Sequence, residues 1–188
     1  MPWIPVPRPL CQWLVGATFL LPLMAQGDDW TRLPPNSGQP SRRFNHTLAY
    51  DSVRNVLVLF GGKNASGNHS SRTWTRNGVL WTESLGTGTP PPQRANHSMA
   101  FDAARGQMVM FGGDLQTGNP TVYYRDTWTW DGTNWSQRST STLPRRTRAA
   151  MAYDALRQQV VMFGGQDETG TNLTDTLLWN GTAWTQAT

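Results

Sequence analysis

Short apolar runs alternate with glycine-rich turns along this chain, and the alternation repeats. Three of the runs end in Phe-Gly-Gly, with the phenylalanine at positions 60, 111 and 163, so that the steps are 51 and 52 residues. A short apolar run that ends in two glycines is typical of a strand covered on both faces. A period of about 50 residues indicates a radial array of similar β-sheets.

The second repeat predicts an antiparallel meander from its own residues. We expect its strands at 96–101, 107–111, 126–130 and 133–137. Gly106 suits the positive φ of the first turn, and Asp131-Gly132 is a two-residue hairpin signal. Repeated along the chain, the pattern predicts three four-stranded blades at about 42–89, 90–141 and 142–188.

Other residues fall into columns when the Phe-Gly-Gly triplets are aligned. An arginine opens each unit and a tryptophan closes it: Arg43, Arg94 and Arg146, then Trp81, Trp135 and Trp184. The paired glycines are Gly61, Gly62, Gly112, Gly113, Gly164 and Gly165. The first strand of each unit carries small side chains and the last two carry tryptophans. That taper suits sheets that converge on an axis and diverge towards a rim.

These columns resemble the kelch-repeat β-propeller family. The matching pattern is the opening arginine with a histidine three residues later, the run to Gly-Gly, Asp-Thr-Trp-x-Trp and the closing tryptophan. The resemblance covers about residues 34–188 and implies an all-β propeller segment. Two departures are visible: the third unit lacks the histidine, and the first unit has Arg72 and Arg76 in place of Asp126 and Trp130.

The number of repeats does not suit an ordinary closed ring, because propellers have about four to eight blades. Residues 26–41 hold a segment, DDWTRL, that resembles the closing strands and reads as a lone leading strand followed by a linker. We therefore predict three blades plus one leading strand, an incomplete ring. The chain is then a piece of a longer repeat protein, a self-associating half-propeller or an open arc, and the spare strand favours the first.

Residues 1–25 have the pattern of a secretory signal peptide. Arg8 precedes an apolar stretch at 14–25, which is too short to span a bilayer comfortably. Cleavage is expected near Ala25, which predicts a secreted or periplasmic protein with no membrane association afterwards. Cys11 is the only cysteine, so the processed chain would contain none.

The net charge of +4 does not indicate a nucleic-acid partner. Of the 16 basic residues only Lys63 is a lysine. That bias fits the codon usage of a GC-rich genome better than a basic binding surface, so we expect no nucleic-acid binding.

Two sets of residues are candidates for chemistry. Arg43, Arg94 and Arg146 would ring one mouth of a central channel and hold an anionic ligand such as a carboxylate or a sulfated sugar. The competing interpretation, which we favour, is that each arginine binds carbonyls of a neighbouring blade. His46 and His97 have no third partner in the last repeat, so they are read as structural and no metal site is predicted.

The loops after Gly-Gly differ in length and sequence while the strands stay alike. Function in repeat folds commonly resides in such loops. Tyr123, Tyr124 and Arg125, in the longest loop, are the best candidates for ligand contact.

The predicted function is a binding module for protein or glycan. Some kelch propellers are enzymes, among them a sialic-acid epimerase. The alternatives are therefore a propeller enzyme that acts on sugars and a purely architectural domain. No catalytic residue or cofactor is predicted. Copper oxidases of this architecture need a cysteine, which the processed chain would lack.

Overall fold

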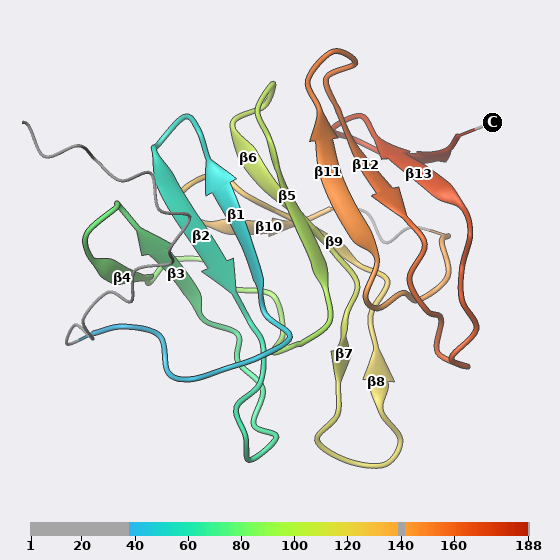
Figure 1. Ribbon diagram of the computed structural model, residues 1–188, viewed down its shortest axis with the longest axis horizontal. Helices are drawn as coiled ribbons and strands as arrows, with labels where there is room; N and C mark the ends of the chain where they lie inside the picture. Colours follow the sequence, from blue (N-terminus) through green and yellow to red (C-terminus); the bar gives the residue numbers. More distant parts are fainter. Residues whose placement is uncertain (1–37, 139–141, 188) are drawn as a thin grey trace, which may run out of the picture. The chain divides into compact units, whose positions relative to one another are not determined.

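The computed structural model describes residues 38–138 and 142–187. It contains three four-stranded antiparallel sheets and one two-stranded sheet, as Figure 1 shows. Blade 1 consists of β1 (Thr47–Asp51), β2 (Val56–Phe60), β3 (Thr73–Arg76) and β4 (Trp81–Ser84). Blade 2 consists of β5 (Ser98–Asp102), β6 (Gln107–Phe111), β9 (Thr127–Trp130) and β10 (Trp135–Gln137). Blade 3 consists of β11 (Ala150–Asp154), β12 (Gln159–Phe163), β13 (Thr176–Trp179) and β14 (Trp184–Gln186).

The expected four-stranded meander is confirmed, with three local differences. β5 begins two residues later than predicted, after Asn96, which has a φ of 56° and donates its N–H to Asn45 in the preceding blade. The last turn of blade 2 is longer than predicted, because the Asp131 carboxylate accepts bonds from the N–H groups of Thr133 and Asn134. The long loop adds a short hairpin, β7 (Asp114–Leu115) and β8 (Val122–Tyr123), that the sequence pattern does not reveal.

Adjacent blades pack through the strands nearest the axis. Val58 and Phe60 of blade 1 form one buried cluster with Met99, Phe101 and the large side chains of blade 2. Val109 of blade 2 packs in the same way with Val160 and the aromatic residues of blade 3. The repeated apolar run is therefore the inter-blade core.

Each closing tryptophan of blades 2 and 3 reaches back to the blade before it. Trp135 donates its indole N–H to Thr73 Oγ1 at 2.8 Å, and its ring lies edge-on to Phe60 at 5.0 Å. Trp184 donates to Thr127 Oγ1 at 3.0 Å. The tryptophan column thus joins successive blades at their outer side as well as filling the rim.

Apolar side chains of the first and last blades are exposed to solvent where their counterparts in the other blades are buried. Phe60 and Phe111 are 0% and 1% exposed under the following blade, whereas the equivalent Phe163 of blade 3 is 53% exposed. On the leading side, Leu48 is 49% exposed where its counterpart Met99 is 7% exposed. The described blades therefore form an incomplete ring, as the sequence predicted.

The Asp-x-x-Arg pairs cap the first hairpin of each blade. Asp51 accepts bonds from the N–H groups of Val53 and Arg54, and the Arg54 guanidinium binds the same carboxylate at 2.7 Å. Arg54 also donates to the Gly106 carbonyl of blade 2 at 2.9 Å. All three pairs are thus turn caps, and those of blades 1 and 2 also join neighbouring blades through Arg54 and Arg105.

The predicted leader and the leading strand lie outside the described residues. Within the described residues, no helix is long and apolar enough to cross a membrane.

Candidate functional site

The three opening arginines share one geometry in their own blades. Each donates through Nη1 to the carbonyl of the first glycine of its Gly-Gly pair: Arg43 to Gly61, Arg94 to Gly112 and Arg146 to Gly164, at 3.0, 2.9 and 2.7 Å. The acceptors therefore lie in the arginine's own blade, whereas the sequence analysis placed them in a neighbouring blade.

Arg94 and Arg146 also form ion pairs with two aspartates that the sequence analysis did not select. Arg94 binds Asp126 through both carboxylate oxygens, at 2.6 and 2.8 Å, and its side chain is 0% exposed. Arg146 binds Asp175 in the same bidentate way at 2.7 Å. This pairing lowers the pKa of Asp175. Both guanidiniums are thus held inside the fold by a planar carboxylate.

The main chain of these arginines holds the preceding blade. The N–H of Gly62 donates to the Arg94 carbonyl, and the N–H of Gly113 donates to the Arg146 carbonyl, both at 2.9 Å. Each residue therefore ties its side chain to its own blade and its main chain to the previous one. That double role explains why the arginine recurs together with Gly-Gly.

Blade 1 departs from this arrangement at the point where Arg72 replaces the aspartate. β3 pairs Thr73 with Phe60 as β9 pairs Thr127 with Phe111, so residue 72 occupies the place of Asp126. Arg72 binds the carboxylate of Glu83 at 2.5 and 2.6 Å. The arginine of blade 1 consequently keeps neutral acceptors, the oxygens of Ser41, Gly61 and Ser70.

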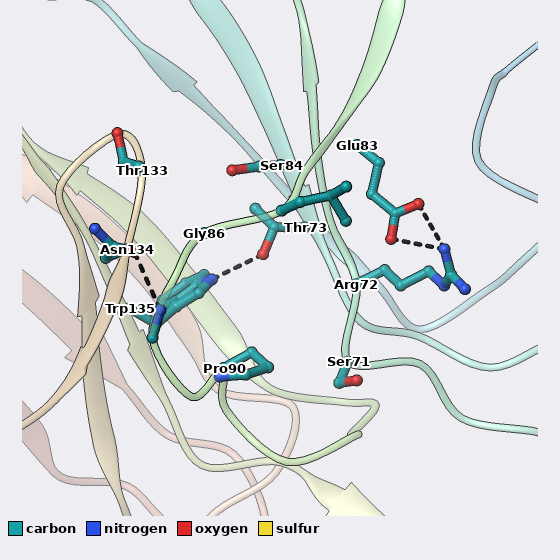
Figure 2. Close-up of a pocket in the computed structure, with 12 residues that line it drawn as sticks. Ser71, Arg72, Thr73, Glu83, Ser84, Gly86, Pro90, Thr133, Asn134 and Trp135 are labelled. Carbon is teal, nitrogen blue, oxygen red and sulfur yellow. Dashed lines mark hydrogen bonds and ion pairs between the residues drawn. The ribbon is translucent and has the colours of Figure 1, made fainter.

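A cavity of about 340 Å³ lies between the outer strands of blades 1 and 2. Figure 2 shows the Arg72–Glu83 pair along it, with Trp135 bonded to Thr73. Sequence reasoning missed this cavity, since its lining comes from two blades. The one feature of the sequence that marked this place was the arginine at position 72, where the aligned second repeat has Asp126.

His97 is a buried connector between blades 1 and 2. Its Nε2 lies 2.6 Å from Thr47 Oγ1, and its ring lies edge-on to Phe60 at 5.5 Å. Burial, and then the positive charges of Arg94 and His46, lower the pKa of His97 to about 3. His46 lies at the equivalent place in blade 1, and burial lowers its pKa as well. Among the described residues, no group of three or more His, Cys, Asp or Glu side chains is placed to hold a metal ion.

The low pKa of His97 predicts a pH-dependent stability. In the unfolded chain His97 takes up a proton below its ordinary pKa of about 6.5, whereas the folded protein does not take it up until about pH 3. The free energy of unfolding should therefore fall as the pH decreases from about 6.5 towards 3, by up to about 1.4 kcal/mol per pH unit.

Urea unfolding at pH 7, 6 and 5 tests this expectation in the wild type and in His97→Gln. The variant should lose the largest part of the slope. The matched His69→Gln variant should lose a smaller part, because burial also lowers the pKa of His69, though less than that of His97. An unchanged slope in His97→Gln would contradict the assignment.

Three loops come together at the blade ends that carry Gly-Gly. The bridges Phe44–Lys63, Ala95–Asp114 and Thr147–Gln166 fix the start of each loop beside the strand that opens the blade. Lys63 Nζ donates to Gln116 Oε1 at 2.7 Å, which links the first two loops. We call the surface made by loops 63–71, 114–125 and 166–174 the loop face. Figure 1 shows these loops projecting on one side, opposite the β5–β6 hairpin.

The candidate residues of the longest loop have different surroundings. Tyr123 lies in β8 and lines a cavity of about 420 Å³ with Arg145 and Glu168 of the third unit. The Tyr124 ring lies 4.0 Å from the guanidinium carbon of Arg94, and burial raises the pKa of its hydroxyl. Arg125 is exposed at the end of the hairpin. Tyr123 and Arg125 are thus on the loop face, while Tyr124 covers a structural arginine.

Comparison with known proteins identifies the family. The model of the KLHDC2/KLHL20/DRC7 Kelch-repeats domain matches residues 20–186. The match begins inside the apolar stretch that the sequence analysis assigns to a leader.

Similar proteins are longer than this chain. Dynein regulatory complex subunit 7 of Chlamydomonas reinhardtii is 33% identical over 87 residues, which are 45% of this chain and 7% of that protein. The F-box/kelch-repeat protein At1g51550 of Arabidopsis thaliana is 32% identical over 146 residues, 69% of this chain and 29% of that protein. The solved structure of YjhT has a TM-score of 0.62 at 13% identity and covers 78% of this chain and 46% of its own. The chain thus spans less than a third of either curated relative.

Proposed function

This chain belongs to the kelch-repeat family, and we propose that it is a protein-binding module whose loop face contacts the partner. Kelch domains generally mediate protein interactions. The observation that carries the proposal is that three loops of different length and sequence start at the same end of a repeated scaffold, and that the first two contact each other. Binding residues commonly lie on such loops, because changes there leave the packed strands intact.

Site-specific photo-crosslinking tests the loop face. A photoreactive amino acid at Thr117 or Glu168, both exposed on that face, should give one specific adduct. The matched positions Ala103 and Leu156 are also exposed, but they lie in the hairpin turns at the opposite end of the strands. They should give none. Equal adducts from both ends, or no adduct at all, would favour a purely architectural domain.

A carbohydrate is the other ligand that the sequence left open. Adducts removed by glycosidases but not by proteases would replace the protein partner with a glycan.

We further propose that additional blades cover the open faces of blades 1 and 3. The exposure of Phe163 and Leu48, whose counterparts are buried in the other blades, supports this proposal. Purified residues 26–188 should then form a dimer or larger species in light scattering, because association buries the exposed apolar faces. A monodisperse, well-folded monomer would contradict the proposal.

Export is proposed from the leader pattern alone. The protein recovered from the exported fraction should begin close to Gln26, since the apolar stretch ends at Ala25. N-terminal sequencing checks this expectation. Intact Met1 in a soluble extracellular fraction would show that residues 1–25 are retained.

A further inference from the structure

Within residues 38–138 and 142–187, the opening arginine of blade 1 binds no internal carboxylate of the kind that its counterparts bind. Arg94 and Arg146 each hold an aspartate through Nη1 and Nη2. In Arg43, Nη1 lies 3.3 Å from Ser70 Oγ and Nη2 lies 3.1 Å from Ser41 Oγ. The Nη atoms that bind a carboxylate in the other blades are therefore bonded here only to neutral oxygens. A hydroxyl can rotate to donate a hydrogen bond as well as accept one.

The remaining contacts of the Arg43 guanidinium match those of Arg94. Nε donates to the carbonyl two residues earlier, that of Ser41 in blade 1 and of Pro92 in blade 2. Nη1 donates to the first glycine of Gly-Gly in both blades. The guanidinium of Arg43 is thus fixed in the orientation that binds a carboxylate in blade 2. It is only half-buried, so this edge is accessible.

A cavity of about 180 Å³ lies in front of this edge. Its lining includes Ser41, Arg43, Lys63, Ser70 and Arg72. Arg72 stands in place of the missing aspartate and carries the opposite charge. The pKa of Arg43 is lowered by burial and then by the charge of Arg72, while Glu83 raises it. Glu83 already binds Arg72, but the lining holds three cations, Arg43, Lys63 and Arg72, which together favour an incoming negative charge.

We propose that this cavity binds the carboxylate of an acidic side chain from a partner protein. That carboxylate takes the place which Asp126 and Asp175 occupy in the other blades. It accepts bonds from Nη1 and Nη2 of Arg43 and from the hydroxyls of Ser41 and Ser70, and Lys63 and Arg72 contribute positive charge. The cavity also contains residues of loop 63–71, so the proposal rests on the proposed function and names the chemistry of one contact on the loop face.

The chain itself provides the test, because one substitution should restore the pattern of the other blades. Arg72→Asp places an internal carboxylate beside Arg43, and we expect it to close the site. Because it also removes the Arg72–Glu83 ion pair, the melting temperature serves only to confirm that the variant is folded. The probe is an end-blocked peptide, acetyl-Gly-Asp-Gly-amide, whose single carboxylate belongs to a side chain. The control peptide contains Asn in place of Asp.

Nuclear magnetic resonance follows the titration through the Arg43 Nε–Hε group and through the backbone N–H of Ser70 in the same cavity, which Arg43→Lys retains. In the wild type the Asp peptide should give a saturable shift. The Asn peptide should bind the wild type about tenfold or more weakly, and the Asp peptide should bind Arg72→Asp about tenfold or more weakly. Arg76→Asp, which has the same charge change on β3, should bind as the wild type does. Arg43→Lys keeps the charge but lacks the two parallel donors, and it should also bind about tenfold more weakly.

Several outcomes would overturn the proposal. These are no saturable shift in the wild type, an equal shift with the Asn peptide, or unchanged binding in a folded Arg72→Asp protein and in Arg43→Lys. Tighter binding of inorganic phosphate than of the Asp peptide would also overturn it, in favour of a free oxyanion. The titration needs only the purified chain and a peptide. A negative result here therefore leaves the crosslinking test of the loop face intact, and failure of the crosslinking leaves this result intact.

Discussion

Replacing Arg94 with alanine should lower the free energy of unfolding by about 3–5 kcal/mol, the usual cost of removing one partner from a buried ion pair. The side chain of Arg94 is 0% exposed, and that of Asp126 is 11% exposed. The substitution leaves Asp126 without its cation and the Gly112 carbonyl without this donor. Trp128 still donates to the carboxylate at 2.7 Å, but it brings no charge.

The matched control is Arg43→Ala in blade 1. Arg43 is half-buried and binds hydroxyl and carbonyl oxygens, so its removal should cost about 1 kcal/mol. Urea unfolding of the two variants side by side measures the difference. Both arginines bind the Gly-Gly carbonyl, and only Arg94 binds an aspartate. Equal losses would therefore show that Asp126 adds nothing to the stabilisation by Arg94. A small loss at both positions would return Arg94 to the group of ligand candidates.

Gly112→Val should be the most damaging single substitution in the Gly-Gly column. Gly112 has a φ of +68°, which side chains with a Cβ rarely adopt, and an added Cβ would collide with the Arg146 carbonyl of blade 3. That carbonyl accepts a bond from Gly113, so it cannot move away without breaking the inter-blade connection. We expect a loss of about 3 kcal/mol or more, from backbone strain and overpacking together.

Gly106→Val separates these two causes. Gly106 has a φ of +62°, but nothing lies within 4 Å of an added Cβ. It should therefore show the strain alone, and Gly112→Val should exceed it by about 1–3 kcal/mol. Thermal or urea unfolding of both variants gives the comparison. If the two losses are the same, the close approach of blades 2 and 3 at Gly112 does not limit stability.

The sequence by itself determined the repeat, the strands and their order in each blade. The reason is that these features depend on local patterns: a buried run such as 107–111, the paired glycines after it, and the Asp131-Gly132 hairpin signal. The taper from small to aromatic residues also predicted which strands lie near the axis. The exposed Phe163 and Leu48 confirm the expected incomplete ring.

Only the tertiary structure decided what the repeated polar residues do. Arg94 and Asp126 are 32 residues apart, and they meet only because β6 and β9 pair and bring the end of the linker beside them. The β7–β8 hairpin, with two-residue strands, has too short a pattern to be read from the sequence. The three arginines look equivalent in the sequence, yet Arg94 and Arg146 are buried against an aspartate, whereas Arg43 is half-buried and has Arg72 in that column. Such differences arise from contacts between distant segments, and an alignment of identical residues does not show which partners each residue contacts.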